Sequence, residues 1–289
     1  MDSSWRRLGT IEPDALVEGR LMLHHASQLV TAAGRSLLDP RPDDSQSAFE
    51  WREDLQSLVG EAIPGEAPWR AALRPADLTL LVLDEGRESA EALLLAGRNL
   101  DAGYAWLRER GGERGADTGR LSRDVPYALP QHAVAKGAAF PQSPLPAFAE
   151  LARYFSNSNR LFRQLAEDLP HVSEVRCWPH HFDLGAMMTL DRPANGEDTP
   201  TVGFGLSAGD DGTPEPYWYV NLSPHPKRLP DPLPPLEGAR WNLEGWLGAV
   251  LPGSVVAAAR TASEQEAKVR RFLTDAVEAA RGLLGPPHA

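Results

Sequence analysis

The chain has 289 residues, an apolar content of 42% and a formal net charge of −11. This length and apolar content are enough for a sizeable buried core. The acidic charge argues against nucleic acid or an anionic membrane surface as the main partner. A lone cysteine excludes an internal disulfide, and we see neither a signal peptide nor a membrane-spanning apolar stretch. We therefore expect a cytoplasmic protein.

The first half of the chain predicts a long helix followed by a hairpin and a second helix. Apolar side chains recur at helical spacing over residues 13–38, with His25 beside the apolar face and His24 nearer the polar side. Residues 69–84 and 90–96 resemble two β arms, and Asn99 or Asp101 is placed to cap a helix that runs to about residue 110.

The loop after the first predicted helix carries Asp43, Asp44 and Ser45. A solvated turn is the expected structure, because these residue types favour turns. Cation binding by the two carboxylates is the alternative.

The second half predicts two more long helices and three successive strands. The helices are expected over residues 146–169, interrupted by a polar run at 156–159, and over residues 263–284 with a capping box at Ser263 and Glu266. The strands are expected over residues 176–190, 201–207 and 215–222, with a short helix at 241–251. Three strands in succession indicate an antiparallel meander, so we expect an α+β fold in which helices cover an antiparallel sheet, as a single domain over residues 1–289.

The stretch from Arg176 to Leu190 holds two adjacent histidines, an aspartate, a tryptophan and the lone cysteine. On a strand, His181 and Asp183 would share one face, and Trp178 and His180 would share the other.

A histidine and a carboxylate on one face form part of a two-histidine, one-carboxylate site for a divalent metal ion. The missing ligand would be one of four other histidines, namely His24, His25, His132 or His225. Two alternatives remain open: acid–base chemistry without a metal, and a buried histidine whose tautomer is held by Asp183.

The last predicted strand of the meander places Glu215, Tyr217, Tyr219 and Asn221 on one face. If this strand neighbours the central one, these side chains converge beside the histidine–aspartate pair in a polar cleft. Cross-strand aromatic packing is the alternative for the tyrosines. The predicted catalytic residues are therefore His181, Asp183, Glu215 and Tyr217. The predicted ligand contacts are His25, Trp178, His180, Tyr219 and Asn221.

The order of several motifs resembles that of an uncharacterised bacterial family of unknown function. The motifs are Trp178-Pro179-His180-His181-Phe182-Asp183, Gly209-Asp210, Pro214-Glu215-Pro216-Tyr217-Trp218-Tyr219, and a tryptophan and Leu251-Pro252 before the last helix, and the resemblance covers roughly residues 173–284. It implies a common fold and a common polar cleft, but no activity. The family pattern has a histidine where Gln46 stands here, so position 46 is not expected to supply a ligand.

The sequence thus predicts an enzyme of unknown reaction that acts on a small molecule. A divalent metal ion is its candidate cofactor. A non-catalytic small-ligand-binding or interaction domain is the alternative function.

Overall fold

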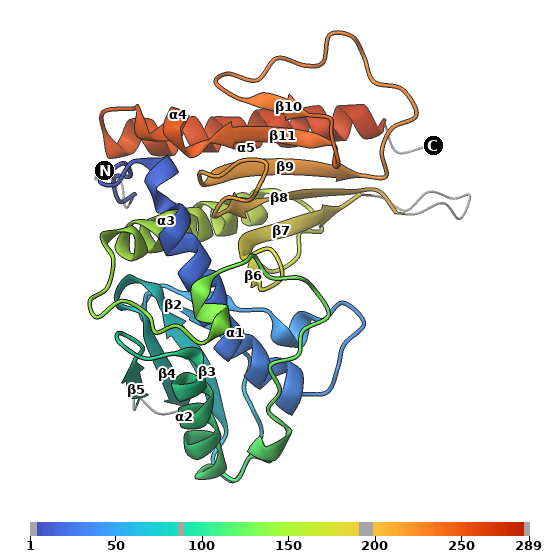
Figure 1. Cartoon of the computed structure of the whole chain (residues 1–289). Coiled ribbons are helices and arrows are strands. Elements are labelled where there is room, and N and C mark those ends of the chain that lie inside the picture. The colour runs from blue at the N-terminus through green and yellow to red at the C-terminus, as the bar shows by residue number, and fades with distance from the viewer. Residues whose placement is uncertain (1–4, 86–89, 191–198, 286–289) are drawn as a thin grey trace. The chain divides into compact units, whose positions relative to one another are not determined.

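The computed structural model describes residues 5–85, 90–190 and 199–285, which form two compact units. The first unit contains Leu16–Ala152 and Arg176–Phe182, and the second contains Met1–Ala15, Arg153–Val175 and Asp183–Ala289. Both units pair an antiparallel sheet with helices, which confirms the α+β fold class (Figure 1). That the chain is a single domain stays a prediction. No helix in the described ranges combines the length and the apolar character needed to cross a membrane.

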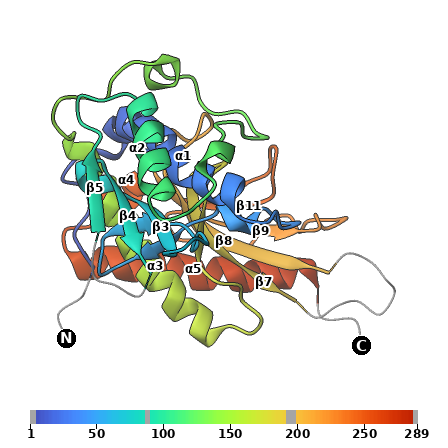
Figure 2. The same ribbon diagram turned by 90° about the horizontal axis from the view of Figure 1, so that it is seen from below.

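The first unit is built on a sheet whose strands follow the chain order. These strands are β1 (Glu50–Arg52), β2 (Ser57–Val59), β3 (Trp69–Arg74), β4 (Thr79–Asp84) and β5 (Ala90–Leu94). Helices α1 (Val17–Leu37) and α2 (Leu100–Gly112) pack on this sheet through β3 and β4. Figure 2 shows β3, β4 and β5 side by side with α2 next to them.

Helix α1 begins after a 3₁₀ turn at Pro13–Leu16 and ends at Leu37, close to the predicted bounds. Its apolar residues Met22, Ala26, Leu29 and Ala33 are buried, as their spacing predicted. The expectation that His24 lies toward the polar side is wrong, because α1 is buried around most of its circumference. Helix α2 is capped by Asn99, whose side-chain oxygen accepts the backbone N–H of Ala102 at 3.1 Å.

The second unit contains the predicted meander. Strands β7 (Asp183–Thr189), β8 (Thr201–Ser207) and β9 (Tyr217–Ser223) pair antiparallel in succession, and β9 is followed in the sheet by β11 (Gly248–Pro252) and β10 (Arg240–Asn242). Helix α5 (Ala262–Leu284) packs against β8 and β9, and the short α4 (Gly253–Ala257) leads into it (Figure 1).

The polar run Ser156–Asn159 does not interrupt its helix, contrary to the sequence prediction: α3 extends unbroken from Pro146 to Asp168. The four side chains are buried, and two of them bind other segments of the second unit. Asn157 accepts the backbone N–H of Arg6 at 2.9 Å and donates to the carbonyl of Arg6 at 2.7 Å, and Ser158 accepts the indole N–H of Trp218 at 2.9 Å. These partners are far away in the sequence, so the pattern of α3 alone does not reveal them.

Two further predictions in the second unit are wrong. Residues 241–251 form parts of two strands, β10 and β11, rather than a helix. Gly248, the first residue of β11, lies so close to β9 that an added Cβ would collide with the carbonyl oxygen of Val220. A glycine is therefore needed where these two strands approach each other. The capping box of α5 uses Thr261 and Glu264, two residues before the predicted pair.

Candidate functional site

The predicted central strand contains a turn where its two histidines lie. Strand β6 (Arg176–Trp178) ends before Pro179, and residues 179–182 form a turn in which Phe182 has a φ of 55°. The N–H of Phe182 donates to the carbonyl of Trp178 at 2.8 Å. Because strand alternation does not continue through a turn, the prediction that His181 and Asp183 share a strand face is wrong. The two residues also belong to different units.

Two buried side chains of α1 bind the turn at residues 179–182. His24 Nε2 lies 2.8 Å from the carbonyl oxygen of Pro179, and Gln28 Nε2 donates to the same oxygen at 3.1 Å. A carbonyl oxygen only accepts, so Nε2 of His24 carries the proton. The His24 ring also stacks on Phe182, with centroids 5.4 Å apart and planes 12° from parallel. The turn is therefore held from its buried side.

The turn presents two exposed imidazoles. The rings of His180 and His181 are 4.3 Å apart, and both residues are exposed. The ring of His180 is also 6.0 Å from Tyr127 and 6.4 Å from Trp178. The hydroxyl of Tyr127 donates at 2.9 Å to the side-chain oxygen of Gln28. The aromatic neighbour of the exposed pair is thus connected to the same α1 side chain that binds the turn.

Two further histidines extend this group. The ring of His25 lies 6.0 Å from that of His132, and His25 Nε2 donates to the carbonyl of Pro130 at 2.9 Å. His132 Nδ1 accepts the N–H of Val134, so its Nε2 carries the proton and donates to Glu18 at 3.1 Å. We call the five residues His24, His25, His132, His180 and His181 the histidine cluster.

Burial keeps the inner histidines neutral. The pKa of His24 is lowered to about 4, mainly by desolvation and to a smaller extent by the neighbouring His25, Arg20 and His181. Burial also lowers the pKa of His25. At neutral pH these two rings are therefore hydrogen-bond donors of fixed tautomer. His24 and His25 therefore support the histidine cluster from inside, whereas His180 and His181 are its solvent-exposed members.

Lowering the pH is expected to destabilise the protein through His24. The folded chain keeps this ring neutral down to about pH 4, whereas an unfolded histidine binds a proton near pH 6.5. Between these values the unfolded state binds more protons, so the free energy of unfolding falls as the pH falls, by about 3 kcal/mol from this group. Urea unfolding across this range should show a weaker pH dependence in His24→Gln, which keeps a donor for Pro179. The exposed-site control His225→Gln should behave like wild type; an unchanged dependence in His24→Gln would contradict this assignment.

The second unit brings together four of the other predicted site residues. Tyr219 donates its hydroxyl to Asp183 Oδ2 at 2.5 Å, and Tyr217 donates to Asp210 Oδ2 at 2.5 Å. Asn221 follows on the same face of β9. Burial, and then the hydrogen bond to Asp210, raises the pKa of Tyr217 above its ordinary value. These are two phenol–carboxylate pairs on one sheet face, and sequence reasoning missed Asp210.

Glycines on β7 and β8 make room for the side chains of β9. Gly205 pairs with Tyr219 and with Gly185, and a Cβ at Gly205 would lie 2.5 Å from the Tyr219 hydroxyl oxygen. A Cβ at Gly203 would similarly collide with the side-chain oxygen of Asn221. The alternating glycines of β8 therefore let Tyr219 and Asn221 lie across the sheet.

Glu215 is not on the strand face where it was predicted. It precedes β9, and its carboxylate accepts the N–H of Ser254 at 2.5 Å and the hydroxyl of Ser254 at 2.9 Å. Glu215 thus binds the first turn of α4. The carboxylate of Glu215 therefore has a hydrogen-bonding partner within the protein and does not need a bound ligand to satisfy it.

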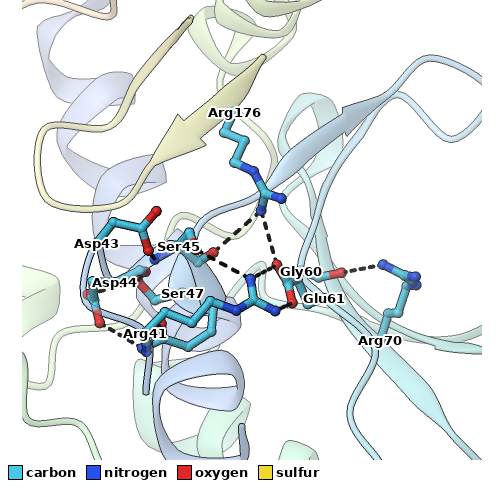
Figure 3. A network of polar contacts seen from close by, with 10 residues as sticks. Arg41, Asp43, Asp44, Ser45, Ser47, Gly60, Glu61, Arg70 and Arg176 are labelled. Atoms are coloured by element: carbon cyan, nitrogen blue, oxygen red, sulfur yellow. Dashed lines mark hydrogen bonds and ion pairs between the residues drawn. The ribbon is translucent and has the colours of Figure 1, made fainter. Parts of the chain in front are cut away.

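The acidic loop after α1 is an exposed turn at Asp43, as predicted, but Ser45 is buried at the start of a 3₁₀ helix (Ser45–Ser47). The loop belongs to an arginine network (Figure 3). Glu61 accepts two hydrogen bonds from Arg41, both 2.6 Å long, and one from Arg176 at 3.1 Å. The bonds from Arg41 are the main reason why the pKa of Glu61 is lowered. Asp43 accepts the N–H of Ser45 at 3.1 Å, which closes the turn. The network joins this loop to β6 through Arg176.

The metal centre and the lone cysteine of the central stretch remain to be placed. Within residues 5–85, 90–190 and 199–285, no group of three or more His, Cys, Asp or Glu side chains is arranged to hold a metal ion. The metal site at His181 and Asp183 stays a prediction. Cys177 is buried, and its backbone pairs with Phe49 through two hydrogen bonds of 2.8 and 2.9 Å.

Comparison with protein-family models, with curated proteins and with solved structures gives no match for this chain. The resemblance to an uncharacterised bacterial family therefore stays a prediction, and function is argued from the geometry.

Proposed function

We propose that the chain is a small-molecule enzyme in which His181, with His180 beside it, exchanges protons with a bound substrate. The observation that carries this proposal is the support of the turn at residues 179–182. His24 and Gln28 both bind the carbonyl of Pro179, yet the residues that follow it are exposed. Functional side chains need a rigid support, and these two buried hydrogen bonds give His180 and His181 such a support.

The chemistry of the exposed pair fits proton transfer. Imidazole is the side chain that ordinarily gains and loses a proton near neutral pH, and a positioned imidazole typically contributes about 10²- to 10⁴-fold to a rate. Tyr127 and Trp178 flank His180 and provide aromatic surface for an uncharged part of a substrate. Trp178, His180 and His181 keep their predicted roles in this proposal, and His25 becomes a supporting residue.

The sheet face of the second unit favours a second candidate, non-catalytic binding of a small ligand. Burial raises the pKa of Tyr217 still further from neutral, which suits a fixed hydrogen-bonding group better than a proton carrier. Asn221 is exposed on the same face and offers an amide to a polar ligand.

A binding screen separates the two candidate sites. Thermal unfolding would be followed with a library of small metabolites for wild type, His181→Gln and Asn221→Ala. The enzyme proposal predicts compounds that stabilise wild type and Asn221→Ala but lose their effect in His181→Gln. Compounds that act equally on wild type and His181→Gln, and lose their effect only in Asn221→Ala, would instead support the sheet face. His225→Gln, another exposed histidine variant, is the matched control.

A metal-dependent form of the enzyme is the remaining part of the proposal. It predicts that the purified protein carries a stoichiometric divalent metal that is lost in both His181→Ala and Asp183→Ala, measured by elemental analysis. Equal metal content in wild type and both variants would contradict that form.

We also propose that the protein is bacterial, as the family resemblance implies, and that it acts in the cytoplasm. A chain with a single cysteine cannot form an internal disulfide, which fits a reducing compartment.

A further inference from the structure

The second unit contains a cavity of about 570 Å³ beside α5, and none of the residues that line it belongs to either candidate site described above. We propose that this cavity binds a small amphipathic anion, an apolar body with a carboxylate or sulfonate head. One wall is α5, and the facing wall is formed by Leu236 with Glu237 and by residues from Val255 to Arg260. The volume lies within the range of roughly 300–1,000 Å³ that is usual for small-molecule sites.

The body of the ligand is inferred from the apolar part of the lining. Phe272 lies on α5, and Leu236 and Val255 are on the facing wall. Ala258 and Ala267 also line the cavity, and both are exposed to solvent. Apolar surface of this kind is covered favourably by a hydrocarbon or an aromatic ring.

The charge of the ligand is inferred from which lining charges already have partners. Arg271 binds Glu237 at 2.7 Å and lies 3.5 Å from Asp275, so this arginine already has two acidic partners. The carboxylate of Glu264 accepts the backbone N–H groups of Arg260 and Thr261 at 2.9 and 3.0 Å. These hydrogen bonds at the start of α5 lower the pKa of Glu264.

Lys268 is the basic group left over. It lies on α5 between Glu264 and Arg271, half-buried, and no acidic side chain within the described residues forms an ion pair with it. Arg260, at the same end of the cavity, already has a carboxylate beside it, because its charge helps to lower the pKa of Glu264. A ligand with an anionic head would therefore find its ion-pair partner in Lys268.

The test uses two probes of the same shape and different charge, naphthalene-1-sulfonate and naphthalene-1-sulfonamide, titrated by isothermal calorimetry at fixed ionic strength. The sulfonate is expected to bind one site at least about tenfold more tightly than the sulfonamide, since a charge-assisted hydrogen bond contributes about that much. Lys268→Glu is expected to remove this difference. Arg281→Glu makes the same change of charge on the same helix outside the cavity, and is expected to keep it.

Ala267→Trp fills the cavity without changing its charge and is expected to abolish binding of both probes, with thermal unfolding used to confirm that the variant folds. The proposal is overturned if the sulfonate does not bind at millimolar concentration. Equal weakening of sulfonate binding by Lys268→Glu and Arg281→Glu overturns it too, because the probe would then respond to the net charge of the protein rather than to the cavity. Unchanged binding in a folded Ala267→Trp places the probe elsewhere and has the same consequence.

Discussion

Gly205→Ala is expected to destabilise the protein by about 3 kcal/mol, at the upper end of the usual cost of overpacking. An alanine Cβ at this position would lie 2.5 Å from the Tyr219 hydroxyl oxygen and 2.7 Å from the backbone carbonyl oxygen of Leu184. Tyr219 is able to swing away, but the backbone of β7 is not, because seven residue pairs hold it in register with β8. The substitution should therefore both strain the sheet and break the hydrogen bond from Tyr219 to Asp183.

Urea unfolding measures this effect, and the chain offers a matched control. Gly282 is a helical glycine of α5 around which an added Cβ would meet nothing within 4 Å. Gly282→Ala is expected to leave stability unchanged or raise it by up to about 1 kcal/mol, because alanine favours the helix. A Gly205→Ala protein as stable as wild type would mean that β7, β8 and β9 do not pack as described.

Trp218→Ala is expected to cost about 3–5 kcal/mol, the usual range for removing a buried large aromatic side chain. Trp218 is fully buried on β9, with its ring 6.3 Å from that of Trp5 and 5.6 Å from that of Tyr154. Its indole N–H donates to Ser158 at 2.9 Å, so truncation leaves a cavity and also removes a buried hydrogen bond.

Trp241→Ala is the matched control for this prediction. Trp241 is half-buried on β10, at the edge of the same sheet, and also makes one indole hydrogen bond, to the carbonyl of Pro234 at 2.8 Å. Its loss is expected to cost less than half as much, because less apolar surface returns to water. Chemical denaturation of both variants checks the difference; equal losses would contradict the position of Trp218 at the centre of this core.

Periodicity predicted the long elements of the fold. The apolar residues of α1, α3 and α5 recur at helical spacing, and the alternation in β8 and β9 predicted the meander. The short segment from Trp241 to Leu251 was wrongly predicted as a helix, because a short apolar run carries too few residues to separate the two periods.

The candidate site was predicted only in part, because long-range partners determine it. The residue types of His180 and His181 indicated a site, but the turn that presents them depends on His24 and Gln28, more than 150 residues earlier in the chain. Similarly, nothing next to Glu215 in the sequence indicates that its carboxylate binds Ser254, 39 residues later. Local patterns thus identified the chemistry of these side chains but not the partners that position them.

The most direct test of the proposed enzyme is a turnover measurement on the compounds that bind. Wild type, His181→Gln and His225→Gln would each be incubated with these compounds, and products would be followed by mass spectrometry. Wild type and His225→Gln are expected to convert at least one compound at similar rates. His181→Gln is expected to be slower by about 10²-fold or more, the loss typical for a general acid–base group. Equal rates in all three proteins, or no conversion of any bound compound by wild type, would contradict the account.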